Sequence, residues 1–182
     1  AGFQCTNTGT GYGGVTLGYR STIAASDYSQ GNVSIGNSAS VTCAPSGTAL
    51  NGVAIGDTVT TTAAAGIATG EKSVADRYGM AAKASGRFSA NGDAQQVGFV
   101  LRIKTTDATA TTLMLDGSAI RLTITSGKVL SAMCRICGIK SDGSAVASYV
   151  RRVVIKNVGG TTSVVGAVET IGTDIEDNAS TD

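Results

Sequence analysis

The absence of histidine from all 182 residues limits the chemistry open to this chain. Without histidine, Ser-His-Asp triads, Cys-His nucleophiles, histidine metal sites and the commonest general base are excluded. Carboxylates stay as candidates, among them Asp57, Asp76, Asp93 and Asp116. A glycosidase needs two carboxyl groups about 5 to 9.5 Å apart across a cleft, and nothing in the sequence pairs these four. We therefore expect no catalytic residues and no enzymatic activity.

Four cysteines, at positions 5, 43, 134 and 137, are the other reactive side chains. Cys134-Arg135-Ile136-Cys137 forms a CxxC motif, but a structural zinc site needs four ligands and a redox site needs a strand-to-helix turn. This motif lies in a predicted strand, where residues three apart point to opposite faces. We expect the cysteines to be free, partly buried thiols and not a disulfide framework.

Two glycine-rich segments superficially match phosphate-binding loops. The first, residues 9–14, has no predicted strand before it and no helix after it, as such a loop requires. The second, residues 66–73, has the wrong glycine spacing, and Glu71 stands between Gly70 and Lys72. We therefore expect no cofactor at either segment.

The charges indicate neither a metal site nor a nucleic-acid surface. Asp174, Glu176 and Asp177 carry the oxygen ligands that Ca²⁺ prefers, but a solvated loop is the simpler interpretation, and we expect no metal. The 14 basic and 13 acidic residues give a net charge of +1, which offers no electrostatic footprint for nucleic acid. No apolar run approaches the ~18 residues that membrane insertion requires.

A short phrase of apolar, small, apolar and glycine residues recurs in the first half of the chain. Its copies are Val15-Thr16-Leu17-Gly18, Val33-Ser34-Ile35-Gly36 and Val53-Ala54-Ile55-Gly56, with a degenerate fourth at Val74-Ala75-Asp76. Each phrase predicts a short strand that ends in a turn, and the polar segments between them predict a second strand and a return path. We expect residues 1–86 to form a β-roll or β-solenoid stalk, with a helical turn between Ser73 and Ala84.

The second half predicts longer strands without intervening helices. Strands are expected at 97–103, 120–124, 128–140, 145–156 and 162–171, with a hairpin turn at Asp142-Gly143. This pattern is typical of an antiparallel sandwich or jelly roll, and we assign residues 87–182 to such a β-sandwich domain. Because the chain ends in the polar segment 174–182, we expect the sandwich to be incomplete at its C-terminus.

The phrases Val33-Ser34-Ile35-Gly36-Asn37-Ser38-Ala39 and Val53-Ala54-Ile55-Gly56-Asp57 resemble the repeats of trimeric autotransporter adhesin heads, which also occur in phage tail fibres. Residues 84–95 resemble the junction that leads into the terminal β-domain of phage fibre proteins, and Leu113-Met114-Leu115-Asp116-Gly117 is similar to part of that domain. The resemblance covers residues 15–172. It implies a virion fibre that is a parallel homotrimer and attaches to the host cell surface.

That resemblance implies three kinds of partner: further copies of the chain, other virion proteins, and a glycan or protein of the host surface. In three parallel chains, Val33, Ile35, Val53 and Ile55 would face a shared interior. Receptor contacts often lie on loops, and the candidates are residues 104–111, 140–144 and 157–162.

Three alternatives stay open: a bacterial trimeric adhesin at the cell surface, a structural fibre or decoration protein without receptor contact, and a carboxylate hydrolase.

Overall fold

The computed structural model describes residues 4–8, 13–24, 31–42, 51–107 and 109–177 of the chain. It is built of strands and turns: no helix occurs in these ranges, and so none that could cross a membrane. The chain divides into two compact units, residues 1–122 and 123–182. The predicted all-β class is therefore confirmed.

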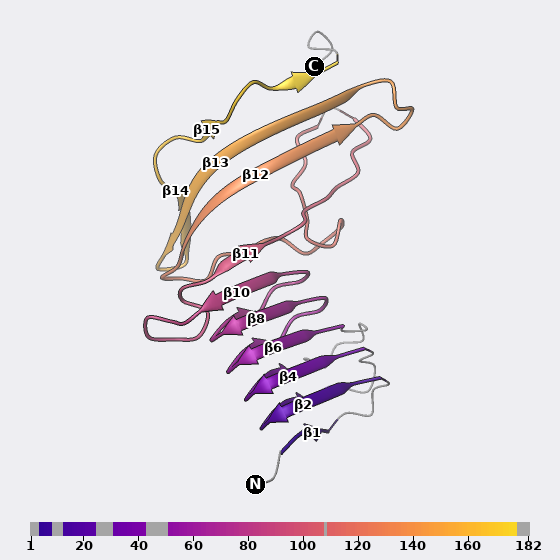
Figure 1. Ribbon diagram of the computed structural model, residues 1–182. Helices are drawn as coiled ribbons and strands as arrows, with labels where there is room; N and C mark the ends of the chain where they lie inside the picture. The colour runs from indigo at the N-terminus through magenta and orange to yellow at the C-terminus, as the bar shows by residue number, and fades with distance from the viewer. Residues whose placement is uncertain (1–3, 9–12, 25–30, 43–50, 108, 178–182) are drawn as a thin grey trace. The chain divides into compact units, whose positions relative to one another are not determined.

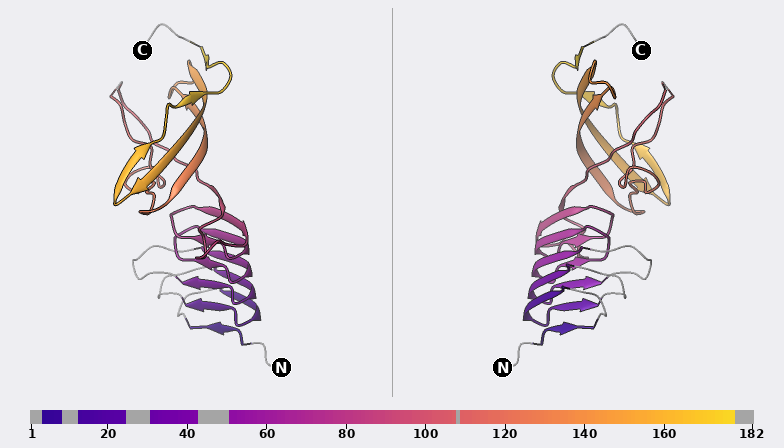
Figure 2. Two further views of the ribbon diagram at one scale, coloured as in Figure 1. Left: turned by 90° about the vertical axis from the view of Figure 1, so that its left-hand side faces the viewer. Right: turned by 90° about the vertical axis from the view of Figure 1, so that its right-hand side faces the viewer.

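The first unit is a stack of parallel coils, each with one longer and one shorter strand (Figure 1). The longer strands are β2 (Val15–Tyr19), β4 (Val33–Asn37), β6 (Val53–Asp57), β8 (Ile67–Glu71) and β10 (Ala81–Ser85). The shorter strands are β1 (Thr6–Asn7), β3 (Thr22–Ala24), β5 (Ser40–Thr42), β7 (Thr60–Thr61) and β9 (Val74–Ala75). Both views in Figure 2 show the successive coils lying one above another. The predicted solenoid and its second strand per repeat are confirmed.

Small side chains fill the space between the two sheets. The inward positions of β4, β6, β8 and β10 include Ser34, Ala54, Ala68 and Ala82, and all four are buried. Larger residues such as Ile23 and Val41 face them from the shorter strands. Two buried hydroxyls donate to carbonyls: Ser34 Oγ to Ala39 O at 2.9 Å and Thr61 Oγ1 to Val53 O at 2.7 Å. The core therefore consists mainly of small side chains, in a chain of which only 4% of the residues are aromatic.

A column of glycines lets successive coils approach each other closely. Gly18, Gly36, Gly56 and Gly70 lie in register on the longer strands, all with positive φ. A Cβ on Gly36 would lie 2.0 Å from the carbonyl oxygen of Gly56, and one on Gly56 would lie 1.8 Å from that of Gly70. No side chain fits at these positions, and this explains the glycine that ends each repeated phrase.

The fourth repeat begins earlier than predicted. β8 starts at Ile67, only 14 residues after Val53, and β10 starts 14 residues later at Ala81. The degenerate copy proposed at Val74 is wrong, because Val74 belongs to the shorter strand β9 and pairs with Thr60. The helical turn expected between Ser73 and Ala84 is also wrong, since this segment supplies strands to both sheets. The coil tolerates this shortening because the missing residues come from the segment that leads from the shorter strand to the next longer strand. The two strands of the coil keep their spacing.

The coils end at Ser85, and β11 (Gln96–Gly98) then pairs antiparallel with β10. Val97 and Phe99 pack against the coil core. The strands expected at 97–103 and 120–124 are largely wrong: beyond Gly98, the described residues up to 122 contain only an isolated bridge between Arg102 and Met114. Apolar alternation is insufficient here, because a strand also needs a neighbour to pair with.

The second unit is one antiparallel sheet. β12 (Val129–Ile139) and β13 (Val146–Val158) form a long hairpin, with the turn at Asp142-Gly143 as predicted. The far edge of β13 pairs with β14 (Thr161–Val164), β15 (Glu169–Thr170) and β16 (Ile175–Glu176), so the single strand expected at 162–171 is interrupted. Gly166 and Gly172, both with positive φ, lie in the two interruptions. Between residues 123 and 177 there is no second sheet to complete a sandwich within the unit.

Candidate functional site

The outer face of the longer strands carries an apolar stripe. We define the stripe by its residues: Val15, Leu17, Val33, Ile35, Val53, Ile55 and Ile67. Their side chains alternate with the inward residues, so they point away from the coil core. Parallel register places them in two rows, with Leu17 beside Ile35 and Ile35 beside Ile55. Leu17 is 62% exposed and Ile55 is 41% exposed, which is unusual for a contiguous aliphatic surface.

The end of the same face is polar. Asn37 lies in register with Asp57, and its Nδ2 donates to Asp57 Oδ1 at 2.7 Å. Lys72 Nζ contacts Asp57 Oδ2 at 2.7 Å and Thr58 Oγ1 at 2.9 Å. The hydrogen bond from Lys72 lowers the pKa of Asp57. This network fixes the corner of the coils and gives Asp57 three polar partners.

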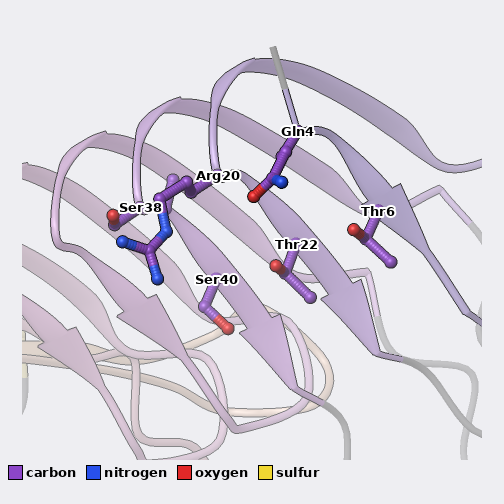
Figure 3. Close-up of a pocket in the computed structure, with 7 residues that line it drawn as sticks. Gln4, Thr6, Arg20, Thr22, Ser38 and Ser40 are labelled. Atoms are coloured by element: carbon purple, nitrogen blue, oxygen red, sulfur yellow. The ribbon is translucent and has the colours of Figure 1, made fainter. Parts of the chain in front are cut away.

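A shallow polar hollow of about 300 Å³ lies on the outer face of the shorter strands (Figure 3). Thr6, Thr22 and Ser40 come from three successive strands, β1, β3 and β5. Arg20 and Ser38 line it from the corners between strands, where both have positive φ. These groups can exchange hydrogen bonds with a hydroxyl-rich or anionic ligand, but they include no general base. The sequence interpretation missed this hollow, because its residues are spread between positions 4 and 40 and share no motif.

The candidate carboxylates act as caps and ion-pair partners. Asp93 accepts hydrogen bonds from the backbone amides of Phe88, Ser89 and Ala90 at 2.7 to 2.9 Å. Asp116 accepts in the same way from the amides of three residues, Ser118, Ala119 and Ile120. These amide donors hold the pKa of both carboxyl groups well below its usual range.

Asp76 is paired with the neighbouring Arg77 at 2.7 Å. Among the described residues, no three His, Cys, Asp or Glu side chains converge as a metal site would require.

The acidic C-terminal segment is held against β13. Arg151 forms a two-pronged pair with Asp174, with both N–O distances at 2.6 Å, and it also lies 5.3 Å from the ring centroid of Tyr149. Asp174 raises the pKa of Arg151, and the pKa of Asp174 is lowered in return. The hydroxyl of Tyr149 donates to Glu176 Oε1. Both carboxylates therefore have partners within the sheet, in contrast to the solvated loop of the simpler interpretation.

The two cysteines of the CxxC motif lie on opposite faces of the sheet. Cys134 is opposite Arg151 and Cys137 is opposite Ser148 in the β12–β13 register, and residues an odd number apart on a strand face opposite ways. Both are exposed, as is Cys5, so the expectation of partly buried thiols is wrong for these three. Cys134 and Cys137 are exposed because no second sheet packs on theirs among residues 123–177, and Cys5 precedes the first strand, β1. Cys43 and residues 9–12 lie outside the described residues.

Two of the three predicted receptor loops lie at opposite ends of the C-terminal sheet. Residues 140–144 are the β12–β13 turn, while 157–162 lie at the other end of β13, a strand of 13 residues. At about 3.4 Å per residue, these two loops are roughly 40 Å apart. Residues 104–111, of which 108 is not described, belong to the other unit.

No protein-family model, no curated protein and no solved structure matches the chain.

Proposed function

We propose that this chain is a structural subunit of a virion fibre that assembles as a parallel homotrimer and attaches to the host cell surface. The observation that carries the proposal is the apolar stripe. Four stacked strands present aliphatic side chains outwards, although the coils already have a complete core of their own. Such a surface costs solubility in a monomer and gains stability once other chains cover it. The virion location and host attachment follow from the sequence resemblance alone.

The first test is the solution mass of the native protein by sedimentation equilibrium. We expect a mass near three chains. Ile55→Asp should break the assembly, because it would place a carboxylate without a counter-ion in a dry interface. Thr42→Asp is the matched control, since Thr42 is exposed on the shorter strand β5, away from the stripe. A monomeric native protein, or an Ile55→Asp variant with an unchanged three-chain mass, would refute this interface.

Attachment is tested separately by binding of the labelled, purified protein to candidate host cells. A trimer that binds no host would support a fibre or decoration protein without receptor contact. A bacterial adhesin head is the second candidate, because the stacked coils carry the phrase Val33-Ser34-Ile35-Gly36 that resembles such heads. Gene neighbourhood separates the two candidates: capsid and baseplate genes support a virion fibre, and a β-barrel anchor gene supports an adhesin.

A further inference from the structure

The C-terminal sheet has almost no hydrophobic core of its own. Among residues 123–177, Asn157 is the one buried residue, and no Val, Ile, Leu or Met in this range is buried. A unit of about 60 residues is already near the lower limit for independent stability even when it has a core. The sheet therefore needs apolar cover from outside itself.

Six exposed apolar side chains lie on one face of the sheet. In the β12–β13 register, Val129, Met133 and Ile139 share a face with Val146 and Val158, and Ile175 joins them from β16 through its pairing with Ser148. We call these six residues the exposed sheet face. Met133 is 60% exposed and Ile139 is 73% exposed. On the other face, the large aliphatic residues of comparable exposure are Ile136, at 37%, and Val164, at 50%, which joins that face from β14 through its pairing with Ile155.

We propose that a second copy of this chain covers the exposed sheet face. The inference rests on the self-assembly part of the proposed function and adds a second place where copies meet. A sheet without a core needs cover whenever it is folded, and a second copy of the chain is always present at a matching concentration. The six side chains expose on the order of 600 Å² together, most of the ~800 Å² that each partner gives to a stable interface.

Two further features of the unit bear on a second copy, its open edge and its charge. β12 lies at the edge of the sheet, and among the described residues no strand pairs with its outer side. An open edge of 11 residues is an aggregation hazard unless another chain covers it. The unit as a whole is electrically balanced, with six basic and six acidic side chains in residues 123–182. The exposed sheet face also carries Arg135, Arg152 and Lys156, and Arg152 is paired with Glu169.

The CxxC motif supplies a built-in pair of reporters for this interface. Cys137 lies on the exposed sheet face beside Ile139 and Val146, whereas Cys134 lies on the opposite face of the same strand. Both thiols are exposed in a single chain. Cover on the exposed sheet face would therefore shield Cys137 selectively from a thiol reagent.

The test uses the purified, unmodified full chain. The protein is pulsed with iodoacetamide at micromolar concentration, quenched and digested, and the labelling rate of each cysteine is measured by mass spectrometry. The same pulse in urea gives the intrinsic rates. We expect Cys137 to react at least tenfold more slowly than Cys134 and Cys5 in the native protein, and at a similar rate in urea. Equal native rates for Cys137 and Cys134, or protection of Cys134 instead, would overturn the proposal.

A variant pair tests the same interface by mass. Ile139→Asp should restore Cys137 labelling and lower the solution mass, while Ser141→Asp in the adjacent turn should change neither. Failure of this inference is distinguishable from failure of the fibre. A three-chain mass with fully reactive Cys137 refutes the sheet interface and leaves the coil interface standing. Protected Cys137 in a protein that binds no host cell supports the sheet interface and refutes attachment.

Discussion

At the scale of single residues, backbone conformation explains more of this chain than side-chain chemistry does. Arg20, Ser38, Thr58 and Lys72 occupy the same corner of successive coils, and all four have φ between 51° and 62°. Their side chains point into solvent or into the Asp57 network, so the corner accepts any residue that tolerates the left-handed region. The glycine column is stricter, because there a side chain would meet the backbone of the next coil.

We expect Gly36→Ala to destabilise the coils by about 3 kcal/mol, since it combines a strained positive φ with a Cβ that overlaps the carbonyl of Gly56. Urea denaturation followed by circular dichroism measures the change. The matched control is Gly138→Ala in β12, where φ is not positive and the added methyl group meets open space. Equal stability of the two variants would show that the coils do not stack as closely as described.

At the scale of elements, the unit of construction is a 14-residue coil. The two most regular coils start at Val53 and Ile67, and earlier coils are longer by four and six residues. The extra residues fall between the shorter strand of one coil and the longer strand of the next. The strand pair and its corner are thus constant, and the return path varies.

Removal of one whole coil should leave a folded protein. Deletion of residues 53–66 joins Gly52 to Ile67 and lets β4 pair with β8 in the same register, with Gly36 against Gly70. We expect a β-type circular dichroism spectrum and cooperative melting at a lowered Tm, because one coil of buried surface is lost. Deletion of residues 60–66 alone, half a coil, should abolish cooperative melting. A half-coil variant as cooperative as the whole-coil variant would contradict the assigned register.

The sequence predicted strands and turns correctly at positions where the backbone accepts only certain residue types. Gly18, Gly36 and Gly56 marked three coils because no other residue fits, and Asp142-Gly143 marked the hairpin because its turn needs such residues. The start of the fourth coil was predicted at the wrong residue because Thr69 stands where the earlier phrases have Leu or Ile. The apolar alternation is therefore incomplete in that copy. The strands expected at 97–103 and 120–124 failed because alternation indicates a possible face but says nothing of a pairing partner. The polar hollow depends on stacking of distant residues, which no local pattern reveals.

At the scale of the whole molecule, the two units differ in how far each can stabilise itself. In the described part of the coils, nine hydrophobic residues are buried in one cluster, from Ile23 to Ala82. The C-terminal sheet buries none among residues 123–177. If copies of the chain supply the missing cover, the stability of the sheet depends on protein concentration through mass action, and the stability of the coil core depends on it less.

We expect amide hydrogen exchange to resolve this difference. Over an approximately hundredfold dilution, amides of β12 and β13 should lose protection before those of β4 to β8, as association weakens. Mass spectrometry of peptides from both units measures the effect within one sample. Uniform protection at all concentrations would mean that each chain stabilises its own sheet, contrary to the proposed assembly.

The direction of the hydrogen bonds in the coils has a mechanical consequence. Backbone bonds such as Val15 N to Asn32 O and Val33 N to Gly52 O connect one coil to the next, so they run along the stack. Tension along that direction would load the hydrogen bonds between one pair of coils at a time. The bonds between different pairs of coils would not share the force. A single chain under pull would therefore yield by peeling coil after coil. Apolar contact along the stripe between neighbouring chains would make several chains share the load. Such bundling would give tensile strength to a coil stack that is weak as a single chain.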